Sequence, residues 1–229
     1  MSIKKITAMY FSATGTTKKI CETIAYEIAK RAGCEKNTYD FTLKENREGF
    51  PELTGEELVI FGTPTYAGRV PNVLLKYLDT ITGNGALAVP VVLFGNRNYD
   101  DSLIELRDIL ETHGFKTIAA GAFVGEHSFS KILAEGRPDA DDIKEALGFA
   151  DDIYKKISEG TFMSPVAVKG EEPVRPYYQP RDRKGNPVNI LKVKPEINKE
   201  LCDKCGICAE VCPMGSIDPE DVFSYKGIC

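Results

Sequence analysis

The sequence predicts an α/β fold in which a doubly wound, five-stranded parallel sheet is covered by helices on both faces. Three observations support this prediction. Five short apolar runs have the composition of buried strands, stretches with apolar residues at helical spacing separate them, and the first run ends in a tight turn rich in hydroxyl groups. Because each connecting helix must bury its apolar stripe against the sheet, the strands are expected to run parallel.

Each predicted element follows from a local pattern. Residues 17–32 place isoleucines at helical spacing, and Gly33 ends that helix. Ser102 and Glu105 have the spacing of a capping box at the start of another helix, and Asp139 is expected to cap the last one. In chain order the predicted elements are a strand at 3–11, a helix at 17–32, strands at 34–41 and 57–62, a helix at 72–81, a strand at 86–94, a helix at 102–113, a strand at 116–124 and a helix at 141–157.

Composition limits the classes of function. Apolar residues make up 42% of the 229 residues and charged residues 28%, which is ordinary for a folded globular chain. The net charge of −5 argues against nucleic acid or an anionic membrane as the main partner. The longest apolar run, 86–94, is interrupted by Pro90 and is far shorter than the roughly 20 residues of a membrane helix. No signal-peptide pattern is present at the amino terminus, so a cytoplasmic location is predicted.

The pattern changes along the chain and predicts three regions. Residues 1–159 carry the alternating strands and helices of the main domain. Residues 160–195 hold six of the 13 prolines and show no helical or strand period, which predicts an extended linker or wrapping arm. Residues 196–229 hold five of the seven cysteines and form a small second domain, part of a ferredoxin-like unit.

The turn after the first strand has the chemistry of an anion site. Ser12, Thr14, Thr16 and Thr17 supply hydroxyl groups around Gly15, where a helix is predicted to begin. N–H groups of the first helical turn, the positive end of the helix dipole and these hydroxyls then converge on one point. No lysine lies in the turn, so a phosphomonoester fits better than a nucleoside triphosphate. The alternative is that the hydroxyls of this turn only cap the helix.

The pattern S-x-T-G-x-T at residues 12–17 resembles the flavin mononucleotide (FMN) phosphate loop of the flavodoxin family. This resemblance implies the strand order 2-1-3-4-5, with the ligand outside the carboxyl ends of strands one and three. Residues 62–71 and 95–101 look like the corresponding loops of flavodoxin domains that are fused to a ferredoxin in anaerobes. FMN is therefore the expected cofactor of residues 1–159.

The second and third loops carry groups suited to a flavin ring. Tyr66 and Tyr99 can each supply an aromatic plane, and Gly95 permits a close approach of the backbone. The chain contains no Trp, so tyrosines must stack on the ring or leave one face open to a substrate. The alternative for each tyrosine is a half-buried loop anchor. Besides the first turn, the predicted FMN-binding residues are Thr63, Pro64, Thr65, Tyr66, Gly68, Gly95, Asn96, Arg97 and Tyr99.

His127 follows the fifth predicted strand at the same edge of the sheet. An imidazole at that place can donate a proton to a flavin-bound substrate, which makes His127 the candidate catalytic residue. The favoured alternative is that His127 only forms a hydrogen bond within its own loop.

The cysteine-rich segment has the spacing of iron–sulfur ligands. Cys202, Cys205 and Cys208 lie on a tight loop that can wrap one corner of a 4Fe–4S cluster, and Cys212 precedes Pro213. Zinc sites commonly use two well-separated cysteine pairs, so zinc fits this spacing less well. In a chain without an export signal, thiols this close together indicate metal ligation and not disulfides.

The segment departs from two-cluster bacterial ferredoxins because it contains only one complete motif. Cys229 stands where a second motif would begin, and Cys212 would by the usual rule ligate the second cluster. The favoured expectation is that the protein continues beyond Cys229; the alternative is that one cluster closes with Cys212 or Cys229. The complete protein is then expected to hold one or two clusters. The candidate metal ligands are Cys202, Cys205, Cys208, Cys212 and Cys229.

These features together predict an electron-transfer flavoprotein. A cluster moves single electrons whereas a flavin holds one or two, so the pair would relay electrons to a redox partner protein or a small acceptor. The alternative is an FMN-dependent reductase of a small acceptor such as a quinone, with His127 as proton donor and the cluster as electron inlet. A third interpretation is an interaction module without cofactors. The sequence leaves open whether the protein is an enzyme or a carrier.

Overall fold

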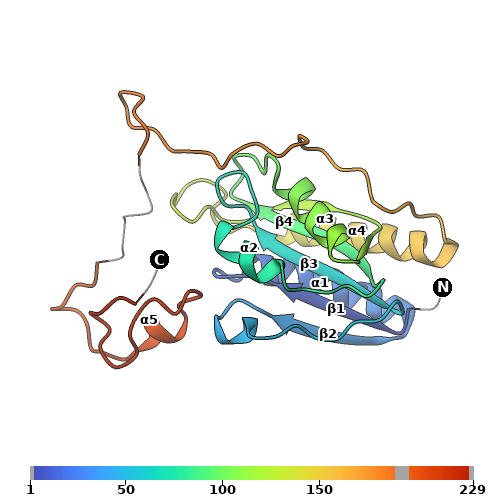
Figure 1. Ribbon diagram of the computed structural model, residues 1–229, viewed down its shortest axis with the longest axis horizontal. Coiled ribbons are helices and arrows are strands. Elements are labelled where there is room, and N and C mark those ends of the chain that lie inside the picture. The colour runs from blue at the N-terminus through green and yellow to red at the C-terminus, as the bar shows by residue number, and fades with distance from the viewer. Residues whose placement is uncertain (1–2, 189–195, 227–229) are drawn as a thin grey trace.

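The computed structural model describes residues 3–188 and 196–226 (Figure 1). The elements in chain order are β1 (Lys5–Tyr10), α1 (Thr16–Ala32), β2 (Glu35–Asp40), the 3-10 helix η1 (Glu45–Arg47), β3 (Glu57–Pro64), α2 (Asn72–Leu78), β4 (Leu87–Phe94), α3 (Ser102–Thr112), β5 (Lys116–Thr117), β6 (Gly121–Val124), α4 (Ala140–Glu159) and α5 (Ile207–Glu210). The predicted strands and helices are present with bounds shifted by no more than three residues, except for the strand predicted at 116–124.

The strands form one parallel sheet in the order β2-β1-β3-β4-β5, and β6 also pairs with β4. This confirms the predicted order 2-1-3-4-5. The direction of winding reverses between β1 and β3, which lie side by side with Tyr10 opposite Gly62. Ligands of doubly wound sheets bind where the winding reverses, beyond the carboxyl ends of the strands.

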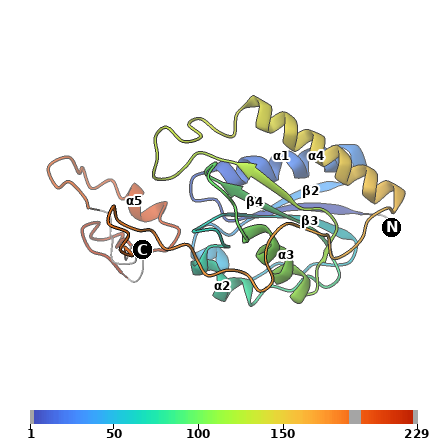
Figure 2. The ribbon, with the colours of Figure 1, turned by 90° about the horizontal axis from the view of Figure 1, so that it is seen from above.

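Helices cover both faces of the sheet (Figure 2). On the face covered by α1 and α4, Ala146 of α4 belongs to the same buried cluster as Ile60 of β3. On the other face, Leu74 of α2 packs in a second buried cluster with Phe61. Consecutive residues of β3 therefore point into different cores, as expected for a strand buried on both faces.

The prediction of one continuous strand at 116–124 is wrong, because two short strands, β5 and β6, occupy that position. Both pair with β4. Ile118 donates its N–H to the carbonyl O of Ala88 at 3.0 Å, so the even-numbered residues of β4 present their backbone groups to this edge. Pro90, two residues further on, has no N–H to donate, and the ladder is interrupted beside it.

The helix starts confirm one capping prediction and overturn another. Asp139 caps α4, and it forms a reciprocal capping box with Asp142. The predicted capping box of Ser102 and Glu105 is wrong, because no side-chain cap forms at the start of α3. Glu105 instead accepts two hydrogen bonds from the guanidinium of Arg69, at 2.6 and 2.7 Å. A guanidinium that donates two hydrogen bonds is a stronger partner for a carboxylate than a single backbone N–H.

The segment 196–226 lies beyond the carboxyl ends of the strands, on the side where β1, β3 and β4 end (Figures 1 and 2). It contains α5, which is a single helical turn. Arg47, at the end of η1, donates a hydrogen bond to the carbonyl O of Pro213 and so connects this segment to the main domain. Within the part of the chain that the structure describes, no helix is long and apolar enough to cross a membrane.

Candidate cofactor site

The three predicted loops meet beyond the carboxyl ends of β1, β3 and β4. Phe11 donates its N–H to the carbonyl O of Gly62 at 3.0 Å, which joins the first loop to the second. Asp101 donates its N–H to the carbonyl O of Gly68 at 3.0 Å, which joins the third loop to the second. The sheet order therefore brings residues from three separate parts of the chain to one edge.

The first loop is a tight turn into α1. Gly15, immediately before the helix, has φ of 82°, a left-handed conformation that a residue with a side chain adopts only with strain. Ser12 Oγ accepts the N–H of Lys18 at 2.9 Å, so Ser12 here acts as a cap, in line with the alternative interpretation. Thr14 Oγ1 and Thr16 Oγ1 lie 3.4 Å apart at the surface. The first N–H groups of a helix have no helical partners, so this turn offers donors to an anion.

Thr63 shows the clearest fit to a bound group. Its side chain is fully buried near the end of β3, and Oγ1 forms no hydrogen bond with any residue that the structure describes. A buried hydroxyl without a partner costs on the order of 1–3 kcal/mol. A polar ligand between the loops can supply this partner. Thr65 differs because its Oγ1 lies 2.7 Å from Ser102 Oγ, a hydrogen bond that ties the second loop to α3.

Tyr66 and Tyr99 differ in how they are held. Tyr66 is 38% exposed and begins a turn closed by hydrogen bonds with the backbone of Arg69. Tyr99 is half-buried and packs edge-on against Phe94, with 5.4 Å between the ring centroids. Tyr66 is therefore accessible to a flat ligand, whereas Tyr99 resembles the loop anchor of the alternative interpretation.

The remaining predicted binding residues lie on the same loops at different depths. Thr17 is buried in the first turn of α1 and Gly68 is buried in the second loop. Pro64 is the last residue of β3. Asn96 and Arg97 are exposed on the third loop. The structure thus brings the predicted set to one edge of the sheet, while their contact with FMN stays a prediction.

His127 lies against the third loop. A Cβ atom at Gly95 would come within 2.6 Å of His127 Cδ2, so the imidazole packs on the Gly95 backbone. His127 Nδ1 accepts the N–H of Phe129 at 3.1 Å, a hydrogen bond within its own loop. With Nδ1 as acceptor, the neutral ring carries its proton on Nε2. The side chain is therefore at the predicted edge and has one nitrogen already engaged.

Sequence reasoning missed the residues that hold these loops from outside. The carboxylate of Asp101, 1% exposed, accepts hydrogen bonds from Arg175 Nε at 2.8 Å and Nη2 at 2.6 Å. Tyr177 and Tyr178 follow and contact the second loop. Part of the predicted linker at 160–195 is therefore packed against the site. The signal available in the sequence was an arginine and two adjacent tyrosines within a proline-rich stretch.

The bond to Arg175 makes folding sensitive to acid. It holds the pKa of Asp101 well below its usual value of 3.8, because hydrogen bonds from the guanidinium stabilise the carboxylate. Below about pH 4 the unfolded chain binds a proton here that the folded chain does not, so the free energy of unfolding decreases as the pH falls. We expect denaturant unfolding, followed by circular dichroism, to lose less stability between about pH 5 and about pH 2 in Asp101→Asn. Identical pH slopes in the two proteins would contradict this expectation.

The predicted cluster ligands share one short segment. Among the described residues, no three His, Cys, Asp or Glu side chains converge closely enough to hold one metal ion. Cys212 Sγ accepts the N–H of Ser216 at 3.3 Å. Cys229 lies outside the described residues. The thiols of Cys205 and Cys208 are exposed, and those of Cys202 and Cys212 are half-buried.

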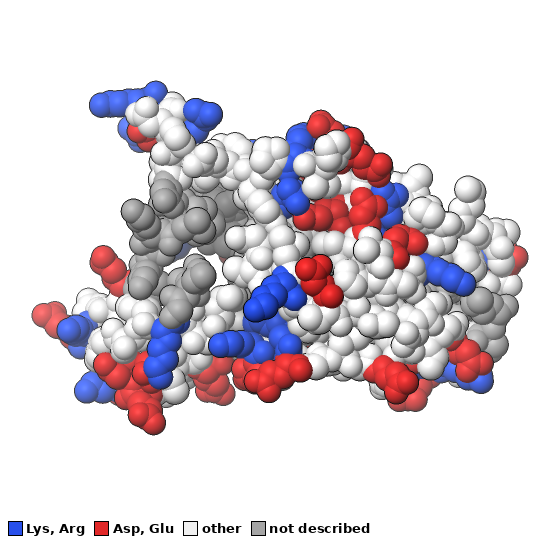
Figure 3. Space-filling model, in the orientation of Figure 1, with Lys and Arg blue, Asp and Glu red and all other residues white. Residues whose placement is uncertain are grey.

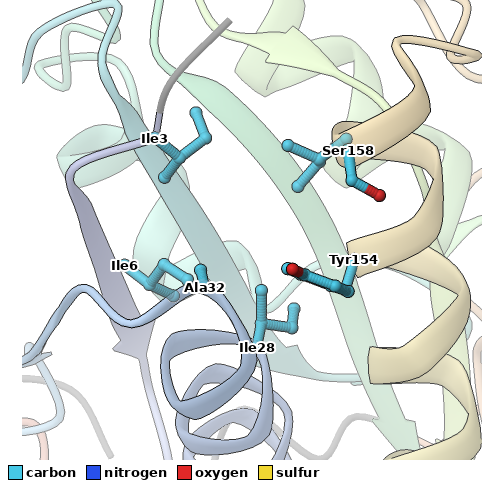
Figure 4. A pocket seen from close by; sticks show the side chains of 7 residues that line it. Ile3, Ile6, Ile28, Ala32, Tyr154 and Ser158 are labelled. Atoms are coloured by element: carbon cyan, nitrogen blue, oxygen red, sulfur yellow. The ribbon is translucent and has the colours of Figure 1, made fainter.

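A separate pocket lies beside the start of β1 (Figure 4). Side chains from the start of the chain, α1 and α4 line it: Ile3, Ile6, Ile28, Ala32, Tyr154, Ile157 and Ser158. None of these side chains is charged at neutral pH, and the pocket is remote from the three loops. It is therefore not part of the candidate site.

The chain combines a doubly wound α/β domain with a cysteine-rich segment. Residues 8–95 match the model of a flavodoxin domain, and residues 194–217 match that of a 4Fe–4S binding domain. Together these matches are those of a flavodoxin–ferredoxin fusion, which confirms the resemblance noted in the sequence. No curated protein matches the chain.

Solved structures with a similar fold cover about two thirds of this chain. Oxidised flavodoxin 1 from Bacillus cereus is 19% identical, with a TM-score of 0.49, over 66% of this chain and 98% of its own. A flavodoxin from Streptococcus pneumonia TIGR4 is 17% identical, with a TM-score of 0.47, over 66% and 99% of the two chains. Rubredoxin oxygen:oxidoreductase from Desulfovibrio gigas is 16% identical, with a TM-score of 0.48, over 68% and 36%.

The flavodoxin domain implies FMN, and the 4Fe–4S binding domain implies a 4Fe–4S cluster. The chain fits FMN because the turn at 12–17 presents helix N–H groups to a phosphate and Thr63, near the carboxyl end of β3, keeps an unpartnered buried hydroxyl. It fits an iron–sulfur cluster because four thiols, the soft donors that such clusters require, lie within residues 202–212.

Proposed function

We propose that the protein relays electrons between its 4Fe–4S centre and FMN and passes them to an external redox partner. Bound FMN would supply a centre that holds one or two electrons, while a cluster exchanges one at a time. The two domain matches support electron transfer in general. A relay within one chain is supported by a single observation, the hydrogen bond from Arg47 of the main domain to the cysteine segment.

Hydrogen bonds link this segment to the predicted phosphate loop. Arg47 Nη2 donates to the carbonyl O of Pro213, the residue after Cys212, and also to the carbonyl O of Thr42 at 3.1 Å. Thr42 Oγ1 accepts the N–H of Ser12 at 2.8 Å. The chain of contacts from Ser12 to Pro213 therefore passes through only two residues. It supports an arrangement in which the cluster ligands lie beside the flavin edge.

Charge complements this contact. Figure 3 shows more acidic than basic side chains on the C-terminal segment, and basic side chains at the adjoining edge of the main domain. Lys44 lies beside the segment, with Cδ 3.5 Å from the place of a Cβ atom at Gly215. Opposite charges on two tethered surfaces favour the association of those surfaces. This attraction weakens as the salt concentration rises.

Anaerobic reduction of the complete protein tests the relay. We expect electrons supplied to the cluster to appear on the flavin at a rate independent of protein concentration, because the transfer is intramolecular. The measurement is stopped-flow absorbance of both cofactors at several protein concentrations. Flavin that stays oxidised beside a reduced cluster would count against the relay, and a rate proportional to concentration would assign the transfer to collisions between molecules.

A second candidate is an FMN-dependent reductase of a small acceptor such as a quinone. It is supported by the position of His127, whose ring packs on the Gly95 backbone at the edge where the three loops meet. Turnover with a panel of acceptors, lost in His127→Ala while FMN content is unchanged, would favour the reductase. Turnover that is equal in both proteins would remove His127 from the chemistry.

We further propose the domain bounds 1–159 and 196–229, with residues 160–195 between them.

Closely spaced thiols in a metal-ligating pattern are typical of a reducing compartment, which supports a cytoplasmic location. The external partner is a redox protein or a small electron acceptor, since the acidic composition offers little attraction to nucleic acid or anionic membrane.

A further inference from the structure

The segment 161–178, called the arm below, runs along the main domain beside α3 (Figures 1 and 2). It is held by specific contacts along its length. Val166 donates its N–H to the carbonyl O of Thr117 at 3.0 Å, and Arg107 Nη1 donates to the carbonyl O of Val166 at 3.1 Å. Val168 packs against the buried cluster beneath α3. These contacts make the arm a covering layer of the domain.

Gly170 shows how closely the arm lies on α3. A Cβ atom at this position would come within 2.2 Å of Ile104 Cγ2, a distance that no side chain can occupy. Only glycine allows the backbone to approach the helix at this point. The sequence of the arm is therefore fitted to the surface on which it lies.

Towards its end, the arm donates several hydrogen bonds to the side chain of Asp101. The carboxylate accepts the backbone N–H of Glu171 at 3.1 Å and that of Arg175 at 2.8 Å, besides the two bonds from the Arg175 guanidinium. Four donors on one nearly buried carboxylate fix this part of the arm at the start of α3. Asp101 is the last residue of the third loop, so these hydrogen bonds lie at the rim of the candidate site.

Two tyrosines then pass over the second loop. Tyr177 donates its hydroxyl to the carbonyl O of Val70 at 2.8 Å. Tyr178 donates its N–H to the carbonyl O of Ala67 at 2.8 Å, beside Tyr66. The Tyr178 ring lies 4.1 Å from the guanidinium carbon of Arg97 on the third loop. Tyr178 therefore bridges the second and third loops from outside and is itself 48% exposed.

We propose that Tyr178 is part of the FMN-binding site and adds its aromatic surface to that of Tyr66 and Tyr99 in a chain that contains no Trp. The arm holds this ring between the two loops. It also fixes Ala67 and Asp101, so the loops are set in place before the ligand arrives and lose less freedom on binding. This inference rests on FMN binding at this edge of the sheet.

Titration of the FMN-free protein with FMN, followed by flavin fluorescence, tests the proposal. We expect Tyr178→Ala to raise the FMN dissociation constant about tenfold and Tyr178→Phe to restore it, because stacking needs the ring and not the hydroxyl. The matched control is Tyr26→Ala, an exposed tyrosine on α1, which should bind FMN like the unaltered protein. Equal affinity in Tyr178→Ala and the unaltered protein overturns the proposal.

Gly170→Val tests the arm without changing any charge or any aromatic ring. The added side chain should displace the arm, so hydrogen exchange in residues 166–178 should increase and FMN affinity should fall. Faster exchange with unchanged FMN affinity overturns the role of the arm. If the unaltered protein does not bind FMN, the cofactor assignment itself is wrong, whereas tight binding that is insensitive to Tyr178→Ala defeats only this inference.

Discussion

Replacing Cys205 with alanine is expected to remove nearly all iron and acid-labile sulfide from anaerobically purified protein while leaving its FMN content unchanged. Cys205 is the central thiol of the first three in the motif and is exposed on its loop. A 4Fe–4S cluster is held by thiolate ligands, so the loss of one thiolate leaves the ligand set incomplete. Iron, sulfide and flavin assays on the same sample provide the measurement.

Cys34→Ala is the matched control for this prediction. Cys34 is a partly exposed thiol of the flavodoxin-like domain and lies just after α1. Its loss should change neither iron nor FMN. Full iron content in Cys205→Ala, or equal loss in both variants, would show that residues 202–212 do not hold the cluster.

Arg47→Ala is expected to slow electron transfer from cluster to flavin by about tenfold or more. A hydrogen bond from a charged group contributes on the order of 2 kcal/mol, which corresponds to a factor of about 30 in the docking equilibrium. The guanidinium also lies 5.7 Å from the ring centroid of Phe11. Its loss therefore removes one contact with the main domain, at Phe11, and one with the cysteine segment, at Pro213. Iron and FMN content should be unchanged, because Arg47 belongs to neither predicted ligand set. Stopped-flow reduction gives the rate.

Arg31→Ala is the control for a general effect of charge. Arg31 lies in the last turn of α1, at the other end of the sheet, and is paired with Glu27 and Asp151. Its removal should leave the transfer rate unchanged. A normal rate in Arg47→Ala would show that the contact with Pro213 does not guide transfer, and the relay would then require another docked arrangement.

Local patterns in the sequence were enough to predict the parallel α/β fold, the three loops and the cysteine motif, and the resemblance to the flavodoxin family implied the sheet order. Apolar runs and helical spacing are properties of neighbouring residues, and the resemblance at residues 12–17 depends on only six positions. The continuity of the fifth strand was not predictable in the same way. It depends on whether Pro90 faces that edge of β4, and this follows from the pairing of the sheet.

The capping prediction at α3 failed for a related reason. Ser102 and Glu105 have a local spacing that favours a capping box, but Glu105 has a stronger partner in Arg69, which lies on a different loop. Competition between a local bond and a distant charged group is decided only when the chain has folded.

The amino-acid sequence by itself predicted the class of fold from periodicity and the iron–sulfur ligands from cysteine spacing, and its resemblance to the flavodoxin family implied FMN. Only the tertiary structure decided that the proline-rich arm belongs to the site, that Asp101 receives Arg175, and that Arg47 contacts Pro213. These pairs are separated by 74 and 166 residues along the chain. No local pattern records such contacts, since they exist only where the folded backbone brings two remote surfaces within hydrogen-bonding distance.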